Sequence, residues 1–201
     1  SGELFEINVM TMEISRKLNL ELSLTSLLKG LTEAVDDIDT GNVISHQVMH
    51  QNSNHSAIKP TWVVPHPDGQ RVYVAANGAD MILEIDLFKW EVVQTFHTGK
   101  GPYNIEITGD GKKMIVSYKS EGATAIWDLY QEKELAVIKN SREITHGISV
   151  SPDDKYAFVS VEGKGIERGS VDIISLDKHR LIDVVEVGKQ AGGIVFWKIE
   201  E

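Results

Sequence analysis

A turn triplet recurs at nearly constant intervals along this 201-residue chain, and the recurrence restricts the possible fold more than any other feature. The triplets are Pro67-Asp68-Gly69, Gly109-Asp110-Gly111 and Pro152-Asp153-Asp154, whose first residues lie 42 and then 43 positions apart. One short apolar run precedes each triplet, and three more follow it before the next unit begins. Four short strands every ~40–45 residues predict the blades of a β-propeller, an all-β fold of four-stranded antiparallel sheets around a common axis.

The four runs of each unit occur in the same order. First strands are expected at 61–64, 103–107 and 146–150, and second strands at 71–75, 113–117 and 156–160. Third strands are expected at 81–87, 124–129 and 171–176, and fourth strands at 91–96, 135–138 and 181–187. These ranges give three full blades.

Half-blades are predicted at both ends of the chain. The hairpin pattern at 3–20 matches third and fourth strands, whereas Gly192-Gly193-Ile194-Val195-Phe196-Trp197 matches a first strand. The expected units are an outer hairpin (1–20), an insertion (21–59), three blades (60–101, 102–144, 145–190) and a closing inner strand (191–201). Three blades and two fragments do not close a ring of the usual ~4–8 blades. Either the remainder of a larger propeller or a second copy of the chain is expected to complete it.

The insertion between the first hairpin and the first full blade adds 36 residues to the repeat. Its first half, 26–39, places Leu27, Leu28, Leu31, Val35 and Ile38 on one face of an expected helix, with Ser26 as its cap. The second half is polar and rich in histidine and asparagine. Insertions in repeat proteins often gather on one face and shape a binding site.

Composition excludes several classes of function. The formal net charge is −10, from 30 acidic and 20 basic residues, which argues against nucleic acid because phosphate binding requires clustered lysine and arginine. No apolar run approaches the ~20 residues of a membrane helix, so no membrane insertion is expected. The chain has no cysteine, which excludes disulfides, thiolate catalysis and cysteine-ligated metals.

The amino-acid sequences of the blades resemble the YVTN-type β-propeller repeat. The segment Val72-Tyr73-Val74-Ala75-Ala76-Asn77-Gly78 after the first triplet carries the resemblance most clearly, and 148–160 and 105–113 are further copies. The likeness covers about 60–199 and the hairpin at 3–20. It implies a prokaryotic protein in the periplasm or at the cell surface, often one with a binding role. Some related propellers carry copper or haem chemistry.

Candidate ligand-binding residues fall near the predicted starts of the innermost strands, where a propeller has the mouth of its central channel. They are Trp62, Tyr103, Asn104, Arg142 and His146. His46, His50 and His55 in the insertion, together with His146, form a candidate metal site at the same mouth. Imidazole ligands suit zinc or copper, and the resemblance adds haem iron.

No side-chain pattern in the sequence indicates a catalytic residue. The carboxylates Asp86 and Asp128 recur at one repeat position, with Asn8 in the same place, which indicates turn stabilisation. We expect a non-catalytic protein that binds a protein partner or a small molecule and needs no cofactor. The alternative is a metal- or haem-dependent redox protein, or a subunit of one, that uses the channel-mouth histidines.

Overall fold

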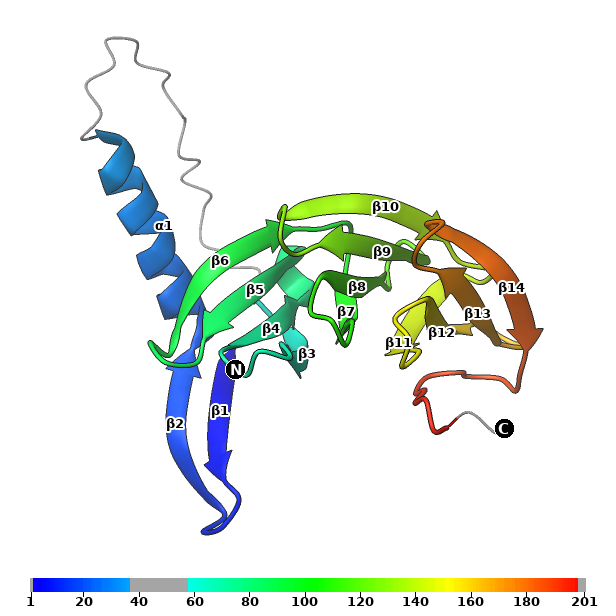
Figure 1. The fold of residues 1–201 in the computed structure, drawn as a ribbon, viewed down its shortest axis with the longest axis horizontal. Coiled ribbons are helices and arrows are strands. Elements are labelled where there is room, and N and C mark those ends of the chain that lie inside the picture. Colours follow the sequence, from blue (N-terminus) through cyan, green and yellow to red (C-terminus); the bar gives the residue numbers. More distant parts are fainter. Residues whose placement is uncertain (1, 37–57, 199–201) are drawn as a thin grey trace.

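The computed structural model describes residues 2–36 and 58–198. Three four-stranded antiparallel sheets follow one another along an arc, preceded by a two-stranded hairpin and one α-helix (Figure 1). Within each sheet the strands pair in the order of the sequence. The predicted all-β propeller architecture with three full blades is therefore confirmed.

Each strand expected in the three full blades is present. The first blade contains β3 (Pro60–Pro65), β4 (Arg71–Ala76), β5 (Met81–Asp86) and β6 (Glu91–His97), with a 3₁₀ turn at Asn77–Ala79. The second contains β7 (Pro102–Ile107), β8 (Lys113–Tyr118), β9 (Ala123–Asp128) and β10 (Lys133–Lys139). The third contains β11 (Ile144–Val150), β12 (Tyr156–Glu162), β13 (Ser170–Ser175) and β14 (Arg180–Glu186). Strands β3, β7 and β11 lie on the concave inner side, and β6, β10 and β14 on the convex outer side (Figure 1).

Apolar side chains fill the spaces between neighbouring blades. Between the first and second blades, Phe96 stands edge-on to Trp127 with 5.8 Å between ring centroids, beside the buried Tyr73 and Tyr118. Between the second and third blades, Ile115 and other β-branched residues form a second core. Alternation along each strand supplies one apolar face to the blade before and one to the blade after. Packing between blades, and not within a single sheet, therefore forms the core.

The repeated polar residues after the third strands stabilise turns, as predicted. The side-chain oxygens of Asn8, Asp86 and Asp128 each accept hydrogen bonds of 2.8–3.3 Å from backbone amides two and three residues ahead. These bonds satisfy amides that have no partner in the sheet. Their recurrence is thus structural.

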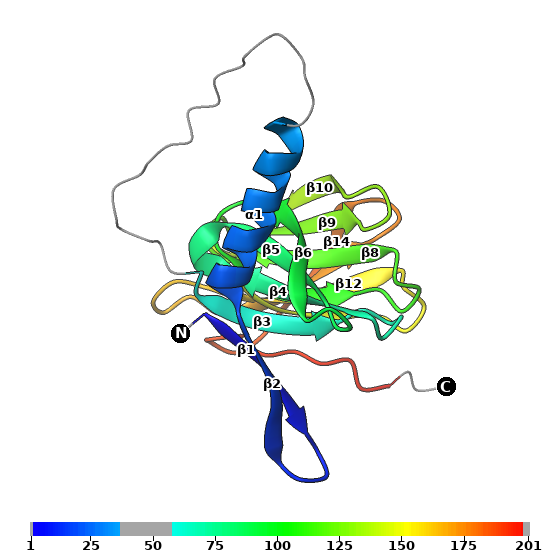
Figure 2. The same ribbon diagram turned by 90° about the vertical axis from the view of Figure 1, so that its left-hand side faces the viewer.

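The N-terminal hairpin, β1 (Glu3–Asn8) and β2 (Glu13–Asn19), forms its own two-stranded sheet beside the first blade. Arg16 of β2 lies over the Trp90 ring, 4.3 Å from its centroid, and donates a 2.7 Å hydrogen bond to the carbonyl of Leu87. The hairpin and the helix extend from the blades in opposite directions (Figure 2).

The helix begins earlier than the sequence pattern predicted. Helix α1 spans Leu20–Asp36, and its first turn is capped by Asn19, whose Oδ1 accepts the amide of Leu22 at 3.0 Å. Ser26 is not the cap: it lies inside the helix and donates to the carbonyl of Leu22. The fully buried Leu20 anchors the first turn in the core of the first blade, which sets the start of the helix. No helix in the described part of the chain has the length and apolar character that crossing a membrane requires.

The C-terminal segment differs from the expected closing strand. It lies beside β11, but no regular strand forms within 191–198. Gly147 donates its amide to the carbonyl of Gly192 at 3.1 Å, and Phe196 donates its amide to Ser149 Oγ at 2.9 Å. A strand needs a continuous backbone ladder with a partner in its own sheet, and the described residues provide none here. The segment thus takes the place of an inner strand without its regular pairing.

Candidate ligand site at the channel mouth

A similar irregularity occurs near the start of all three inner strands. The pairing register shifts between Pro60 and Trp62, between Pro102 and Ile105, and between Thr145 and Ile148, with one extra residue on the inner strand each time. Such bulges bend a strand and redirect its side chains, and they are common beside functional sites. The bulges include Thr61, Tyr103 and His146, which the repeat aligns with one another.

Contacts between blades bring two of these residues together. The ring of Tyr103 stands at 90° to the imidazole of His146, with 5.5 Å between the centroids. Thr61 Oγ1 donates to the carbonyl of Tyr103 at 2.8 Å, which joins the first blade to the second at this point. The edge-to-face arrangement places the positive rim of one ring against the negative face of the other.

Two charged residues that the sequence analysis did not select complete the cluster. The ammonium of Lys119 lies 4.1 Å from the centroid of Tyr103, and Glu162 Oε2 lies 2.8 Å from Nε2 of His146. Lys119 follows β8 and Glu162 ends β12, so antiparallel pairing returns both to the starts of β7 and β11. We call Thr61, Tyr103, Lys119, His146 and Glu162 the mouth cluster.

Each member of the mouth cluster offers a different interaction to a ligand. The carboxylate fixes the orientation of the imidazole, and the ammonium lies over an aromatic face as a cation–π pair. Tyr103 and His146 are partly exposed, so an aromatic edge, a cation and a carboxylate are presented within one small area. This combination suits recognition of a polar or aromatic group.

Asn104 has a different role from the one predicted. It is buried; its side-chain Oδ1 accepts the amide of Ile148 at 3.1 Å, and its own amide donates to Ser117 Oγ at 2.9 Å. It therefore joins β7 to β11. Ser160 does for the third blade what Ser117 does for the second, accepting the amide of Gly147 at 2.9 Å. The sequence contained a signal for these contacts: a serine stands at the same position in the second strand of both blades.

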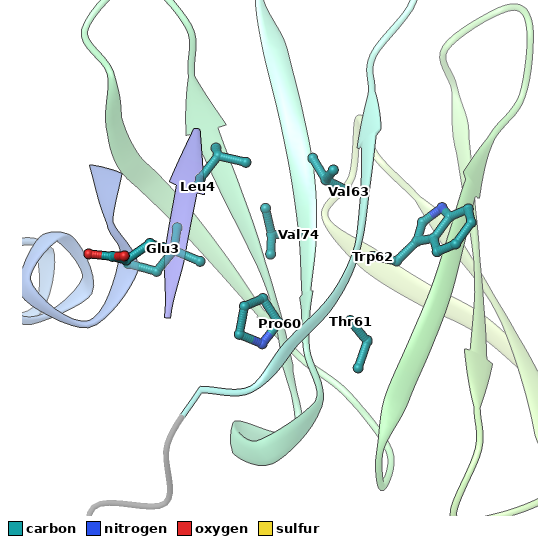
Figure 3. Close-up of a pocket in the computed structure, with 8 residues that line it drawn as sticks. Glu3, Leu4, Pro60, Thr61, Trp62, Val63 and Val74 are labelled. Atoms are coloured by element: carbon teal, nitrogen blue, oxygen red, sulfur yellow. The ribbon is translucent and has the colours of Figure 1, made fainter. Parts of the chain in front are cut away.

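Arg142 is held by a loop of the third blade, and Trp62 lines a groove beside the first blade. Arg142 contacts the loop after β12, with Nε 3.1 Å from Glu167 Oε1 and 3.2 Å from the carbonyl of Arg168. Trp62 is about half exposed on β3, and its side chain points away from Leu4 and Val74 (Figure 3).

The metal-site prediction rests mainly on residues that the structure does not describe. His46, His50 and His55 lie outside the described residues, which resume at Ile58, two residues before β3. Among the described residues, no three histidine, aspartate or glutamate side chains come close enough to hold a metal ion. Of the four predicted ligands, only His146 is therefore placed, with Glu162 as its partner.

An apolar groove of about 390 Å³ lies between β1 and the first blade, and Thr61 of the mouth cluster belongs to its lining. Leu4, Val63 and Val74 line it from three different strands (Figure 3). Glu3 and Pro60 lie at its sides.

Comparisons with known proteins support the fold. No family model matches the chain. Protein NirF of Pseudomonas aeruginosa is 27% identical over 118 residues, which cover 54% of this chain and 30% of NirF. Solved structures of U3-55K and of the RRP9 WD40 repeats each superpose with a TM-score of 0.58 at 14% identity, covering 68% of this chain and 42% of theirs.

The class of protein follows from the fold and these comparisons. The chain is a β-propeller protein with a WD40-like arrangement of blades. It spans less than a third of the length of NirF and less than half of each of the two WD40-type chains.

Proposed function

We propose that the chain is a YVTN-type, non-catalytic binding or scaffolding propeller that engages a protein partner or a small molecule through the mouth cluster. The observation that carries the proposal is the repeated bulge, which turns Tyr103 and His146 toward each other from neighbouring inner strands. A bulge costs ladder hydrogen bonds, and the serines at 117 and 160 offset that cost.

The position of the insertion supports a ligand site at this end of the blades. The carbonyl of Ile58, near the C-terminal end of the insertion, accepts the amide of Gly78 at 2.9 Å, and the chain continues directly into β3. The insertion therefore rejoins the propeller close to Thr61. Loops beside a rigid scaffold commonly contribute to binding.

Native mass spectrometry of the protein purified from its own source tests the proposal. The wild-type protein is expected to carry a bound molecule or partner that Tyr103→Ala loses and that Tyr130→Ala retains, because Tyr130 is 93% exposed in a remote hairpin turn. Equal occupancy in the two variants would show that the mouth cluster is not the binding site.

The resemblance and His146 also support a second candidate, a metal- or haem-dependent redox protein. His146 is held by a carboxylate, an arrangement that orients metal-ligating imidazoles in many proteins. Elemental analysis of protein purified without chelator tests this. Stoichiometric copper, zinc or iron that is lost in His146→Ala would favour it over the binding proposal.

We also propose a periplasmic or cell-surface location, on the resemblance alone. Fractionation of cells that express the protein, with detection by antibody, tests it. Recovery in the cytoplasmic fraction would contradict it.

A further inference from the structure

We propose that the mouth cluster binds the carboxylate of a small organic acid with one negative charge, and that the ammonium of Lys119 pairs with it. This inference rests on the proposed binding function and names the chemical class of the ligand. The members of the cluster come from adjoining blades that pack on each other, so the fold fixes their positions.

The charge of Lys119 has no carboxylate partner among the described residues. Other cationic side chains in the loops at this end of the blades have one: the pairs are Lys100–Asp80, Arg142–Glu167 and Arg168–Glu186, at 2.6, 3.1 and 3.2 Å. The ammonium of Lys119 instead contacts the ring of Tyr103, 4.1 Å from its centroid. A ring face attracts a cation but does not neutralise it. This position therefore favours an anionic ligand.

Lys119 is also held in place. Its backbone amide donates to the carbonyl of Gly101 at 3.0 Å, and the following turn closes with a 3.1 Å bond from the amide of Glu121 to the carbonyl of Tyr118. The side chain is half-buried against Tyr103. An ordinary surface lysine loses side-chain entropy when it pairs with an anion, which offsets much of the gain. Because Lys119 is ordered beforehand, it loses less on binding.

The neighbouring charges limit the ligand to a small monoanion. Glu162 places a carboxylate in the same cluster, 2.8 Å from His146. The guanidinium of Arg142, a group whose geometry suits phosphate, already contacts Glu167 and the carbonyl of Arg168. A phosphate or a dicarboxylate would thus meet one ammonium and be repelled by Glu162. A monocarboxylate needs only the one ammonium.

NMR titration of the ¹⁵N-labelled protein at constant ionic strength tests the proposal, with propionate as the probe and propionamide as its neutral counterpart. Propionate is expected to shift the amides of the mouth cluster saturably, with a Kd on the order of 1–10 mM, and propionamide to leave them unchanged. Lys119→Met is expected to weaken propionate binding by about tenfold or more, because a charge-assisted contact is lost.

The control is Lys155→Met, which removes an exposed lysine from a turn at the opposite end of its blade. It is expected to bind propionate as the wild type does. Circular dichroism checks that both variants keep their fold. Equal affinity of wild type and Lys119→Met, or shifts of the same size with propionamide, would overturn the proposal.

The preference for a single charge is tested with malonate, a dianion. Glu162→Gln keeps an acceptor for the His146 imidazole but removes the repelling charge. Its affinity is expected to rise about twofold for propionate and about fivefold for malonate, since the repulsion scales with the charge of the ligand. An equal change for both anions would contradict the role assigned to Glu162.

The ring of Tyr103 acts as a positioning group for Lys119. Tyr103→Phe keeps the aromatic face and is expected to bind propionate as the wild type does, whereas Tyr103→Leu is expected to bind it several-fold more weakly. Equal weakening in both would mean that the hydroxyl, and not the ring, assists the carboxylate. If the natural ligand is lost in Tyr103→Ala but propionate binding ignores Lys119, this inference fails while the binding function stands.

Discussion

The carboxylate of Asp154 in the third blade accepts a 2.7 Å hydrogen bond from the backbone amide of Gly109 in the second. Its other oxygen accepts the next amide, that of Asp110, at 2.9 Å. Asp154 occupies the triplet position where the other two blades have glycine, and its backbone has a φ of 57°. The backbone of Asp154 therefore adopts the left-handed conformation at the turn of the third blade. Its carboxylate also stabilises the corresponding turn of the second blade.

Replacing Asp154 by asparagine tests the link between these blades. Asparagine tolerates the left-handed backbone but retains one neutral acceptor, so we expect a loss of about 1 kcal/mol in the free energy of unfolding. Urea denaturation measures it. Asp177→Asn, which changes a largely exposed carboxylate, is expected to change stability by less than about 0.5 kcal/mol. Equal effects of the two substitutions would show that the inter-blade bonds contribute nothing.

A second carboxylate links the connection between the second and third blades to β13. Asp172 is fully buried and accepts from the amide of Ser141 at 2.7 Å, from Asn140 Nδ2 at 3.1 Å and from the hydroxyls of Ser141 and Ser170. Because Asp172→Ala leaves several buried donors without an acceptor, we expect a loss of about 3 kcal/mol or more. Asp172→Asn retains one acceptor oxygen and is expected to lose less.

Differential scanning fluorimetry compares these two variants with the wild type. A fall in Tm that is clearly larger for alanine than for asparagine is expected. Indistinguishable falls would contradict the assigned role, because loss of charge alone would then account for the effect.

The sequence predicted the blades because three copies of the repeat within one chain can be compared with one another. Three aligned copies placed every described inner strand, and the same alignment brought Tyr103 and His146 to one mouth. It did not find Lys119 and Glu162, which become neighbours of the inner strands only through antiparallel pairing. Comparison of the repeats gives little information about the role of a residue that appears in one blade only. Asp172 is an example, since Leu83 and Ala125 hold its place in the other blades.

Other departures have local physical causes. Helix α1 begins at Leu20 because burial of that side chain and the cap from Asn19 stabilise the first turn. The apolar pattern had predicted a later start, with Ser26 as the cap. The segment after β14 carries the residue pattern of a strand, but it lacks a ladder partner among the described residues. Propensity alone does not make a strand without such a partner.

The Tyr103–His146 contact is open to a double-mutant cycle. Tyr103→Leu and His146→Gln are made singly and together, and the free energy of unfolding is measured for all four proteins. We expect a coupling of about 0.5–1.5 kcal/mol, the usual value for an edge-to-face aromatic pair. A coupling within error of zero would show that the rings meet without stabilising each other, and the bulges would then have no energetic link across the blades.

Acid stability should depend on the turn residue Asp110. The backbone amide of Lys112, with further contributions from the Lys112 ammonium and the Thr108 hydroxyl, lowers the pKa of Asp110 from 3.8 to about 2. Because the folded state holds the proton less tightly than the unfolded state, this carboxylate stabilises the fold above pH 3.8 and loses that effect as pH falls toward 2. Asp110→Asn is therefore expected to be less stable than wild type at pH 6, and the gap between their urea midpoints should close with acidification. A gap that stays constant from pH 6 to pH 2 would mean that the turn gains nothing from the charge of Asp110.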